Sequence, residues 1–383
     1  MIYFDNSATT RPYPEVIETY TTVAQRYFGN PSSLHGIGME AERLLQQSRS
    51  LVARLLGVLP GEIVFTSGGT EGNNLAVKGT ALQYRSRGRH IITTKIEHAS
   101  VAQAFEQLEQ LDFEVTYLPV DQRGIVSVEA VQRAIRSDTI LVSVIHVNSE
   151  TGAVQPVEEI GRLLRAHPKV LFHVDHVQGI GKVPLSLSAG DIDLCTMSGH
   201  KFHSVKGTGI LFVRSGVQLG PLLSGGQQEH AYRSGTENLA GIVAMTKALR
   251  MTLENQDANI KHMRQLQTEL FCFLRTIPEA VLNTTPEVSA PHIVNVSFPG
   301  VKPEVLVHAL EEHGIYVSTK SACSSKTGGA SGILLAMGLN EQTAGSAIRI
   351  SLSAENTMEE VREFQRALRQ VLPKLYEVTR LRK

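Results

Sequence analysis

The sequence has few cysteines, no excess of charge of either sign and no long apolar runs. Cys195, Cys272 and Cys323 are the three cysteines among 383 residues, and they lie far apart. A sparse, odd-numbered set argues against a disulfide framework and favours a reducing compartment. Lys and Arg total 37, as do Asp and Glu, so the composition gives no electrostatic reason to expect nucleic acid or a membrane surface as the main partner.

The apolar runs and the start of the chain exclude two further classes. Runs such as residues 139–147 are the size of a strand and too short to span a bilayer. Residues 1–15 contain Asp5 and no apolar core of the kind found in signal peptides, so we expect no secretory leader. Together with the cysteine usage, these absences predict a cytoplasmic protein.

Short apolar runs alternate with helical patterns from about residue 40 to about residue 215. The runs occupy residues 62–67, 90–95, 113–120, 139–147, 170–175, 193–198 and 209–214. Helix-length segments such as 100–111 and 156–167 separate several of them. This alternation predicts an α/β fold, in which a mostly parallel seven-stranded sheet is flanked by helices.

The pattern changes after residue 239. One long amphipathic helix is expected from there to about residue 277, followed by a mixed segment and a last helix with the capping-box pair Thr357 and Glu360. We therefore predict a large domain at residues 15–250. A smaller α+β domain would comprise residues 251–383 together with 1–14.

Polar residues gather where the predicted strands end, which is where open α/β sheets bind ligands. The first strand is followed by Gly-Gly-Thr-Glu-Gly-Asn-Asn at residues 68–74, a small-residue helix start that suits an anion. This segment is neither a Walker motif nor a dinucleotide fingerprint. Later strand ends add a further group of polar residues: His98, Asn148, Glu150, Asp175, His176, Gln178, Ser198, His200 and Lys201.

Two site chemistries fit these residues. A metal centre could draw on His173, Asp175 and His176 with His200 and His203, although their spacing matches no established ligand pattern. A pyridoxal-phosphate site needs an amine nucleophile, a carboxylate for the pyridine nitrogen, an anion cradle and a ring over the cofactor. Lys201, Asp175, the turn at residues 68–70 and His98 would supply these four groups.

Nine motifs resemble those of the cysteine desulfurases, in the class V aminotransferase group of fold-type I pyridoxal-phosphate enzymes. In chain order they are FDNSATT, GNPSSLHGIG, TSGGTEGNNLAVKG, IEHASV, VNSETGAVQP, HVDHVQGIGK, SGHKFHSVKGTG, RSGTEN and STKSACSS. The resemblance runs from about residue 3 to about residue 355. It implies pyridoxal 5'-phosphate as cofactor and conversion of L-cysteine to L-alanine.

The resemblance also assigns roles to individual residues. Lys201 would bind the cofactor covalently, Cys323 would take the sulfur as a persulfide, and His98 would stack on the ring and move protons. The other cofactor ligands implied are Gly69, Thr70, Asp175, Gln178, Ser198, His200 and Thr236. Asn148 and Arg349 would hold the substrate carboxylate, for which an arginine fork is well suited.

The partners implied are L-cysteine, a second copy of the chain and a sulfur-acceptor protein, either an iron–sulfur scaffold or a tRNA thiolation enzyme. Thr236 would reach the cofactor of the other subunit in a homodimer. No direct binding to nucleic acid or membrane is expected. A selenocysteine lyase or another class V transaminase is the alternative on the same scaffold, and a catalytically silent scaffold subunit is the alternative outside enzymes.

The surroundings of the cysteines and two departures from the family pattern add expectations. Cys323 lies between Lys320 and Lys326 in SACSSKTGGASG, which is rich enough in glycine and serine that we expect it to be mobile. Cys195 and Cys272 are expected in the core.

Ser149 replaces a common Asn and is expected to alter one local hydrogen bond. His176 replaces a small residue and would place a titratable group beside the cofactor.

Overall fold

The computed structural model describes residues 1–189, 191–319 and 329–381. Its large sheet contains β2 (Ile63–Thr66), β3 (His90–Thr94), β4 (Glu114–Leu118), β5 (Thr139–Ile145), β6 (Leu171–Asp175), β7 (Leu194–Ser198) and β8 (Gly209–Val213). The helices between and after these strands are α1 (Pro14–Arg26), α2 (Gly36–Leu56), α3 (Gly69–Tyr84), α4 (Ala99–Glu109), α5 (Val128–Ala134), α6 (Val157–Leu164) and α7 (Leu239–Glu254). Three 3-10 turns are η1 (Pro60–Glu62), η2 (Gly199–Lys201) and η3 (Gln228–Ala231).

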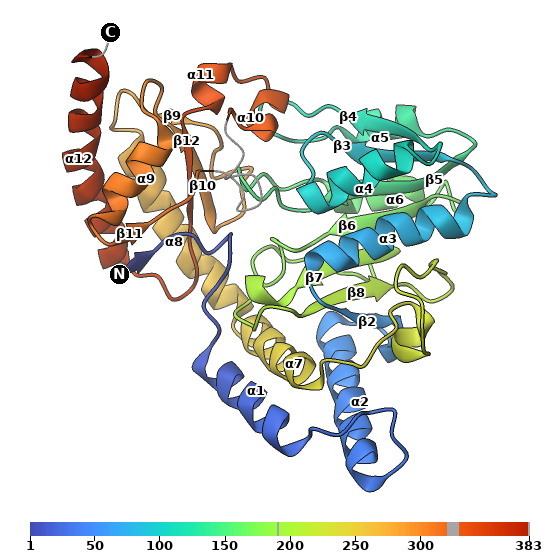
Figure 1. Cartoon of the computed structure of the whole chain (residues 1–383). Coiled ribbons are helices and arrows are strands. Elements are labelled where there is room, and N and C mark those ends of the chain that lie inside the picture. The colour runs from blue at the N-terminus through green and yellow to red at the C-terminus, as the bar shows by residue number, and fades with distance from the viewer. Residues whose placement is uncertain (190, 320–328, 382–383) are drawn as a thin grey trace.

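The seven strands form one sheet in the order β2-β8-β7-β6-β5-β3-β4 (Figure 1). Strands β3 to β7 run parallel, and β8 runs antiparallel to both β2 and β7. Each strand coincides with one of the seven apolar runs in the sequence. The predicted α/β fold with a mostly parallel seven-stranded sheet is therefore confirmed.

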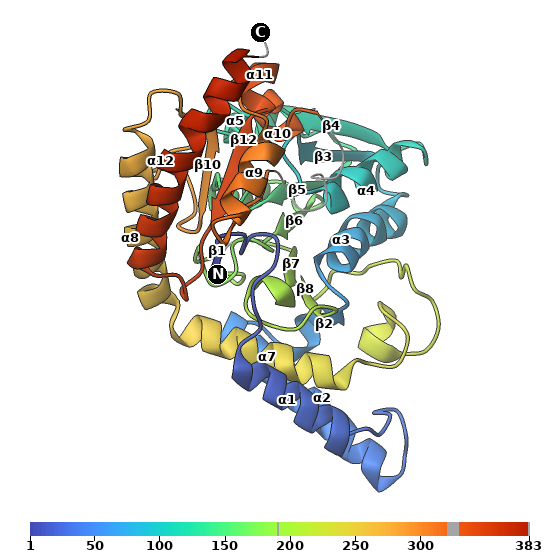
Figure 2. The same cartoon turned by 60° about the vertical axis from the view of Figure 1, so that its left-hand side comes forward.

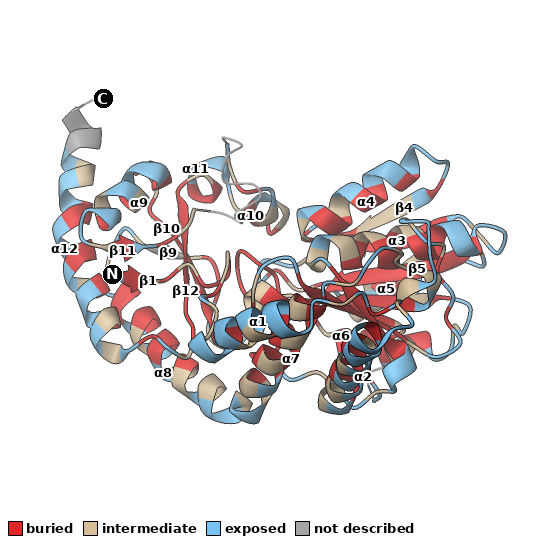
Figure 3. Cartoon of the chain, turned by 60° about the horizontal axis from the view of Figure 1, so that its bottom comes forward, coloured by how far each residue is buried: buried red, intermediate tan, exposed pale blue. Residues whose placement is uncertain are grey.

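Helices cover both faces of this sheet, and successive strand residues pack on opposite faces. Ile92 and Val142 join a core with α1, α2, α6 and α7, whereas their neighbours Ile91 and Leu141 join a core with α3 and α4. Burial on both faces explains why these strands are continuous apolar runs. Figure 2 shows the long helices α3 and α7 on either side of the sheet, and Figure 3 shows the buried strands between them.

A second core lies beside the sheet. It is built on β9 (Val281–Leu282), β10 (Ile293–Ser297) and β12 (Ala347–Ser351), with β1 (Ile2–Tyr3) paired to β11 (Ile315–Tyr316). Its helices are α8 (Gln256–Leu274), α9 (Pro303–Glu311), α10 (Gly332–Ala336), α11 (Glu341–Ala344) and α12 (Met358–Leu381). Because β1 belongs here, the N-terminus lies next to the C-terminal part of the chain (Figure 1).

Helix α12 follows its sequence pattern closely. The Thr357 hydroxyl accepts from the Glu360 backbone at 3.2 Å, and the Glu360 carboxylate accepts from the Thr357 backbone at 2.9 Å. This reciprocal pair is the capping box that the sequence predicted. Val361, Phe364 and Leu368 then pack into the second core.

The single helix expected from residue 239 to 277 is instead two helices, α7 and α8, which meet at Asn255. The Asn255 backbone leaves the helical region at φ −110° and ψ 11°. Residues up to Leu249 pack against the large sheet, while Leu266 and later residues pack in the second core. The break lets the chain leave one core for the other. A domain division at residue 250 stays a prediction, and the two cores lie on either side of it.

Within the described part of the chain, no helix combines the length and the apolar character needed to cross a membrane.

Candidate active site

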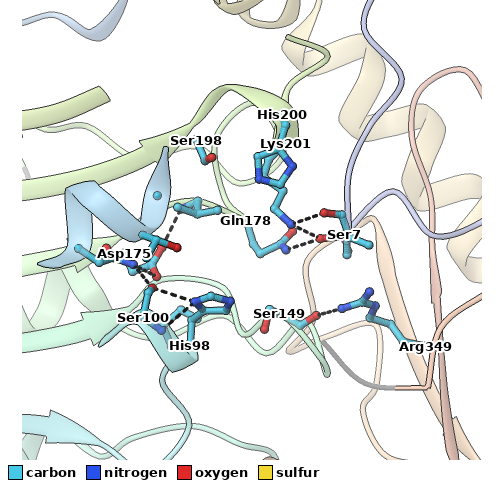
Figure 4. Close-up of a pocket in the computed structure, with 16 residues that line it drawn as sticks. Ser7, His98, Ser100, Ser149, Asp175, Gln178, Ser198, His200, Lys201 and Arg349 are labelled. Atoms are coloured by element: carbon cyan, nitrogen blue, oxygen red, sulfur yellow. Dashed lines mark hydrogen bonds between the residues drawn. The ribbon is translucent and has the colours of Figure 1, made fainter. Parts of the chain in front are cut away.

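A cavity of about 240 Å³ lies at the carboxyl ends of the central parallel strands, between the two cores. Nine of the twelve residues that the sequence assigned to the site line it (Figure 4): Gly69, Thr70, His98, Asp175, Gln178, Ser198, His200, Lys201 and Arg349. They come from segments that span residues 69 to 349. The tertiary structure therefore gathers most of the predicted site into one place.

The anion cradle is formed where β2 turns into α3. Gly68 has φ 153° and ψ −176°, a backbone conformation that only glycine adopts readily. Helix α3 then begins at Gly69, where an added Cβ would lie 2.9 Å from Val177 Cγ2 and 3.4 Å from Ser198 Cβ. Gly69 and Thr70, at the helix start where backbone N–H groups lack helical partners, line the same cavity as Ser198 and His200. This set of donors fits a phosphate group.

His200 contributes to this cradle as a neutral ring. Burial, followed by the charges of Lys201 and Lys206, lowers the pKa of His200 to about 3. Its Nδ1 lies 3.2 Å from Thr9 Oγ1. Because the ring is uncharged near neutral pH, it would bind an anion through a hydrogen bond rather than through a charge.

Asp175 ends β6 and is 2% exposed. Its carboxylate accepts from Asn73 Nδ2 at 2.8 Å and from the Val177 backbone at 3.0 Å. Burial raises the pKa of Asp175, while His98, Lys201 and these hydrogen bonds act in the opposite direction. None of the ion pairs among the described residues includes this carboxylate. A buried carboxylate of this kind fits a protonated pyridine nitrogen.

Lys201 ends η2 and reaches across to the N-terminal segment. Its Nζ donates to the carbonyl oxygen of Ser7 and, at 2.8 Å, to that of Ala8. Gln178 Nε2 also donates to the Ser7 carbonyl, at 2.9 Å. Lys182 is buried and donates from Nζ to the Lys201 carbonyl at 2.7 Å, which holds the Lys201 main chain. An amine, a buried carboxylate and an anion cradle thus share one cavity and fit pyridoxal phosphate.

Arg349 lies on β12 and is 1% exposed. Its Nη1 donates to the Ser149 carbonyl at 2.7 Å, and its Nη2 pairs with Asp5 Oδ1 at 2.9 Å. Its Nε is buried and has no partner among the described residues. The guanidinium is therefore held at the cavity wall opposite Asp175, where a substrate carboxylate would be bound.

Asn148 differs from this expectation, because its side chain does not line the cavity. Its Nδ2 donates to the Ile96 carbonyl at 2.9 Å, and its Oδ1 accepts from the backbone of Glu150 and Thr151. The amide thus shapes the turn after β5. Ser149 is the residue of this turn that reaches the cavity. The role predicted for Asn148 stays a prediction.

Thr236 is exposed and lies outside the cavity of its own chain, and Cys323 lies outside the described residues. Lys320 and Lys326 also lie outside them.

Cys195 is buried in β7, as expected. Cys272 is exposed, so its prediction as a core residue is wrong. Helix α8 buries Leu266, Leu270 and Leu274 on one face, and Cys272 lies about 200° from Leu270 around the helix.

Seven cavity residues were not assigned from the sequence, and all but Ile145 lie in a motif quoted there: Ser7, Ala8, Asn73, Ser100, Ile145, Ser149 and Val177. Ser7 and Ala8 act through backbone carbonyls, which no residue type reveals. His173, considered above for a metal, bonds instead to Ser143 and Thr196 inside the sheet. No cluster of three metal-binding side chains occurs among residues that the structure describes.

Comparisons with known proteins agree with this geometry. The aminotransferase class-V family model matches residues 2–364. A putative cysteine desulfurase, IscS 1 of Bacillus subtilis (strain 168), is 43% identical over 376 residues, covering 98% of this chain and 99% of that protein. The cysteine desulfurase IscS of Methanosarcina thermophila is 41% identical over 374 residues, covering 98% and 92%.

Solved structures give the same result. A NifS-like protein aligns with a TM-score of 0.92 at 41% identity, covering 98% of this chain and 100% of that chain. SspA in complex with cysteine aligns with a TM-score of 0.81 at 33% identity, covering 93% and 100%. The chain therefore belongs to the class-V aminotransferase family of pyridoxal-phosphate enzymes and, within it, to the cysteine desulfurases.

Proposed function

We propose that this cysteine desulfurase moves sulfur from L-cysteine to an acceptor protein through a persulfide on Cys323, with Lys201, Asp175, His98 and Arg349 serving the reaction. The observation that carries the proposal is the single cavity in which these four side chains meet. A similar structure, SspA, was solved in complex with cysteine, which supports the same substrate here.

Each residue has a distinct task in this proposal. Lys201 Nζ would hold the cofactor and later carry the proton removed from the substrate α-carbon. Asp175 would keep the pyridine nitrogen protonated, and the turn at residues 68–70 with Ser198 and His200 would hold the phosphate. Bound pyridoxal phosphate supplies the electron sink for the substrate α-carbon. Arg349 would bind the substrate carboxylate through its planar guanidinium.

The sulfur step balances without an added oxidant or reductant. The Cys323 thiolate attacks the substrate sulfur, an S–S bond forms, and the bond between that sulfur and the substrate β-carbon breaks. The electron pair of the broken bond remains with the carbon skeleton, which takes up a proton to become L-alanine. The net change converts L-cysteine and a thiol into L-alanine and a persulfide.

The test compares two cysteines of the same chain. Wild-type enzyme given L-cysteine should form L-alanine and gain one sulfur atom at Cys323, measured by mass spectrometry of the digested protein. Cys323→Ser should lose sulfur transfer, whereas Cys272→Ser should retain it, because Cys272 is exposed on α8 away from the cavity. Lys201→Ala should lose both products and the visible absorbance of bound cofactor.

Three results would contradict the proposal. They are sulfur transfer by Cys323→Ser, full turnover by Lys201→Ala, and a large preference for selenocysteine in direct competition. The last result would favour the selenocysteine lyase. An iron–sulfur scaffold and a tRNA thiolation enzyme remain the proposed acceptors, and transfer of labelled sulfur from Cys323 to each purified candidate would distinguish them.

We further propose that the enzyme acts as a homodimer in which Thr236 completes the phosphate site of the partner. Thr236 is exposed, and a salt bridge between Arg233 Nε and Glu71 Oε1 at 2.8 Å anchors its loop to α3. Large apolar side chains are exposed near α1 and α2, among them Phe28 (73%) and Leu34 (95%). A second copy would cover such surface.

Mixed dimers test this arrangement. Lys201→Ala and Thr236→Ala chains would be unfolded together and refolded as a mixture. If Thr236 acts across the interface, a mixed dimer contains one intact site, and activity should exceed that of either variant alone. No gain in activity, or a monomer by sedimentation, would contradict the proposal.

A further inference from the structure

The imidazole of His98 is oriented by a residue two positions further along the chain. His98 caps α4, and its Nδ1 accepts from the Ser100 backbone N–H at 3.2 Å. A backbone N–H can only donate, so this bond favours a ring whose Nδ1 carries no proton. In a neutral ring the proton must then lie on Nε2.

The Ser100 hydroxyl strengthens the same choice. Ser100 Oγ lies 2.8 Å from His98 Nδ1 and accepts from Asn73 Nδ2 at 2.9 Å. Because Oγ receives a hydrogen from Asn73, its own hydrogen is available for Nδ1. Two donors therefore converge on His98 Nδ1.

Asp175 fixes the direction of this chain of hydrogen bonds. The second hydrogen of Asn73 Nδ2 is donated to Asp175 Oδ2 at 2.8 Å. Rotating the amide by 180° would place the Asn73 carbonyl oxygen against the Asp175 carboxylate, and two acceptors repel one another. The donors thus run outward from Asn73, to Asp175 on one side and through Ser100 to His98 on the other.

The four residues come from α3, the start of α4 and the end of β6, and all four line the cavity. Asn73 is 1% exposed, Ser100 9% and Asp175 2%. Water competes weakly at such depth, so each hydrogen bond constrains its partners strongly. On the other edge of the ring, Nε2 is turned away from Ser100 and toward the side of Ser149 and Arg349 (Figure 4).

We propose that Ser100 and Asn73 are positioning residues that fix the tautomer of His98, so that Nε2–H is the group that exchanges a proton with the substrate. The inference rests on the proposed function of His98 in proton transfer. The same hydrogen bonds tie the orientation of His98 to Asp175. The ring that would stack on the cofactor and the carboxylate that would pair with the pyridine nitrogen are therefore positioned together.

Kinetics provide the first measurement. Ser100→Ala removes the hydroxyl donor and should lower kcat about 10-fold while KM for L-cysteine changes less than about 2-fold. Asn73→Ala should act in the same direction, because it frees the Ser100 hydroxyl to turn away. Ser100→Thr retains a hydroxyl and should restore most of the rate. Thr80→Val is the matched control on α3, since Thr80 is buried and its hydroxyl has no partner among the described residues.

A second measurement does not depend on turnover. Nitrogen-15 NMR of histidine side chains, with and without bound cofactor, would identify the His98 signals by their loss in His98→Gln. In wild type and Thr80→Val the proton should reside on Nε2. In Ser100→Ala the hydroxyl donor at 2.8 Å is lost and only the backbone donor at 3.2 Å remains, so part of the proton should move to Nδ1.

An unchanged tautomer in Ser100→Ala, or a proton on Nδ1 in wild type, would overturn the inference. Alanine production by the wild type separates this result from the proposed function. If the wild type forms no L-alanine from L-cysteine, the proposed function fails, whereas the NMR result by itself decides the tautomer.

Discussion

Arg49 and Glu229, 180 residues apart in the sequence, form a buried, bidentate ion pair. Arg49 Nη2 lies 2.6 Å from Glu229 Oε1, and Nη1 lies 2.9 Å from Oε2. Glu229, His230 and Ala231 all have positive φ, at 47°, 58° and 60°. Residues with a Cβ rarely adopt this conformation. The ion pair therefore holds a strained segment immediately before the loop that contains Thr236.

Removing the carboxylate of this pair should destabilise the protein strongly. Glu229→Ala leaves the buried Arg49 charge without a counter-charge, with the Ile63 carbonyl as an acceptor that remains, and it removes the acceptor of the Phe65 backbone N–H. We expect a loss of about 3–5 kcal/mol in the free energy of unfolding, measured by urea denaturation. Glu359→Ala is the control, because its pairs with Arg362 and Arg366 are exposed and should contribute little. Equal effects of the two substitutions would contradict the assignment.

Gly209 should control cofactor affinity without touching the cavity. An added Cβ at this position in β8 would lie 2.7 Å from Gly68 Cα and 2.6 Å from Thr66 Oγ1. The contacted Gly68 atom belongs to the main chain and cannot rotate away as a side chain could. Gly209→Ala should therefore displace the turn at residues 68–70. Overpacking of this kind costs about 1–3 kcal/mol, so affinity for pyridoxal phosphate should fall about 10-fold or more.

The measurement is a titration of apoprotein with pyridoxal phosphate, followed by visible absorbance. Gly61→Ala serves as the control, because an added Cβ there meets nothing within 4 Å. Unchanged affinity in Gly209→Ala would show that the turn does not hold the phosphate.

Arg349→Lys should impair substrate binding more than chemistry. Lysine keeps the charge but loses the planar fork that contacts Ser149, Asp5 and the proposed substrate carboxylate. We expect kcat/KM for L-cysteine to fall about 10- to 100-fold, mainly through KM. Steady-state kinetics would check this, with urea denaturation to separate it from loss of fold. A change in kcat alone would place Arg349 in the chemical step instead.

Buried histidines should make the fold sensitive to acid. Burial lowers the pKa of His173 to about 3 and that of His146 to about 4. As the pH falls from about 6.5 toward 4, the unfolded chain binds protons at these positions while the folded chain does not. The contribution of these two histidines to the free energy of unfolding is therefore complete above about pH 6.5 and is lost as the pH falls toward 4. Glu97 acts in the opposite direction, since burial raises its pKa to about 8.

The contribution of one histidine can be isolated by difference. His173→Gln removes the titrating ring, so its stability should fall less steeply with pH than that of wild type, by about 1.4 kcal/mol per pH unit between about pH 6 and 4. Urea denaturation at a series of pH values measures both slopes. Parallel slopes would mean that His173 becomes protonated in the folded protein.

Local patterns in the sequence were enough for the seven strands and the capping box of α12. Apolar β-branched runs such as residues 139–147 favour a strand through their own side chains, and Thr357 with Glu360 lie only three positions apart. The predicted set of cavity residues came from the resemblance of the motifs to a known family. Nine of its twelve members line one cavity. Eight of them end or follow strands of the large sheet, whose carboxyl ends meet at one edge, and Arg349 comes from β12 of the second core.

Tertiary packing decided what no local pattern encodes. Lys201 bonds to Ser7, 194 positions away, through a backbone carbonyl, and Asn73 meets Asp175 across 102 positions. Cys272 faces outward because the second core selects the Leu270 face of α8, and α7 ends at Glu254 because two cores compete for one helical stretch. A residue's own neighbours fix its preference for helix or strand. Which distant group it contacts depends on how whole elements pack, and such contacts bring Asn73 to Ser100 and Asp175 beside His98.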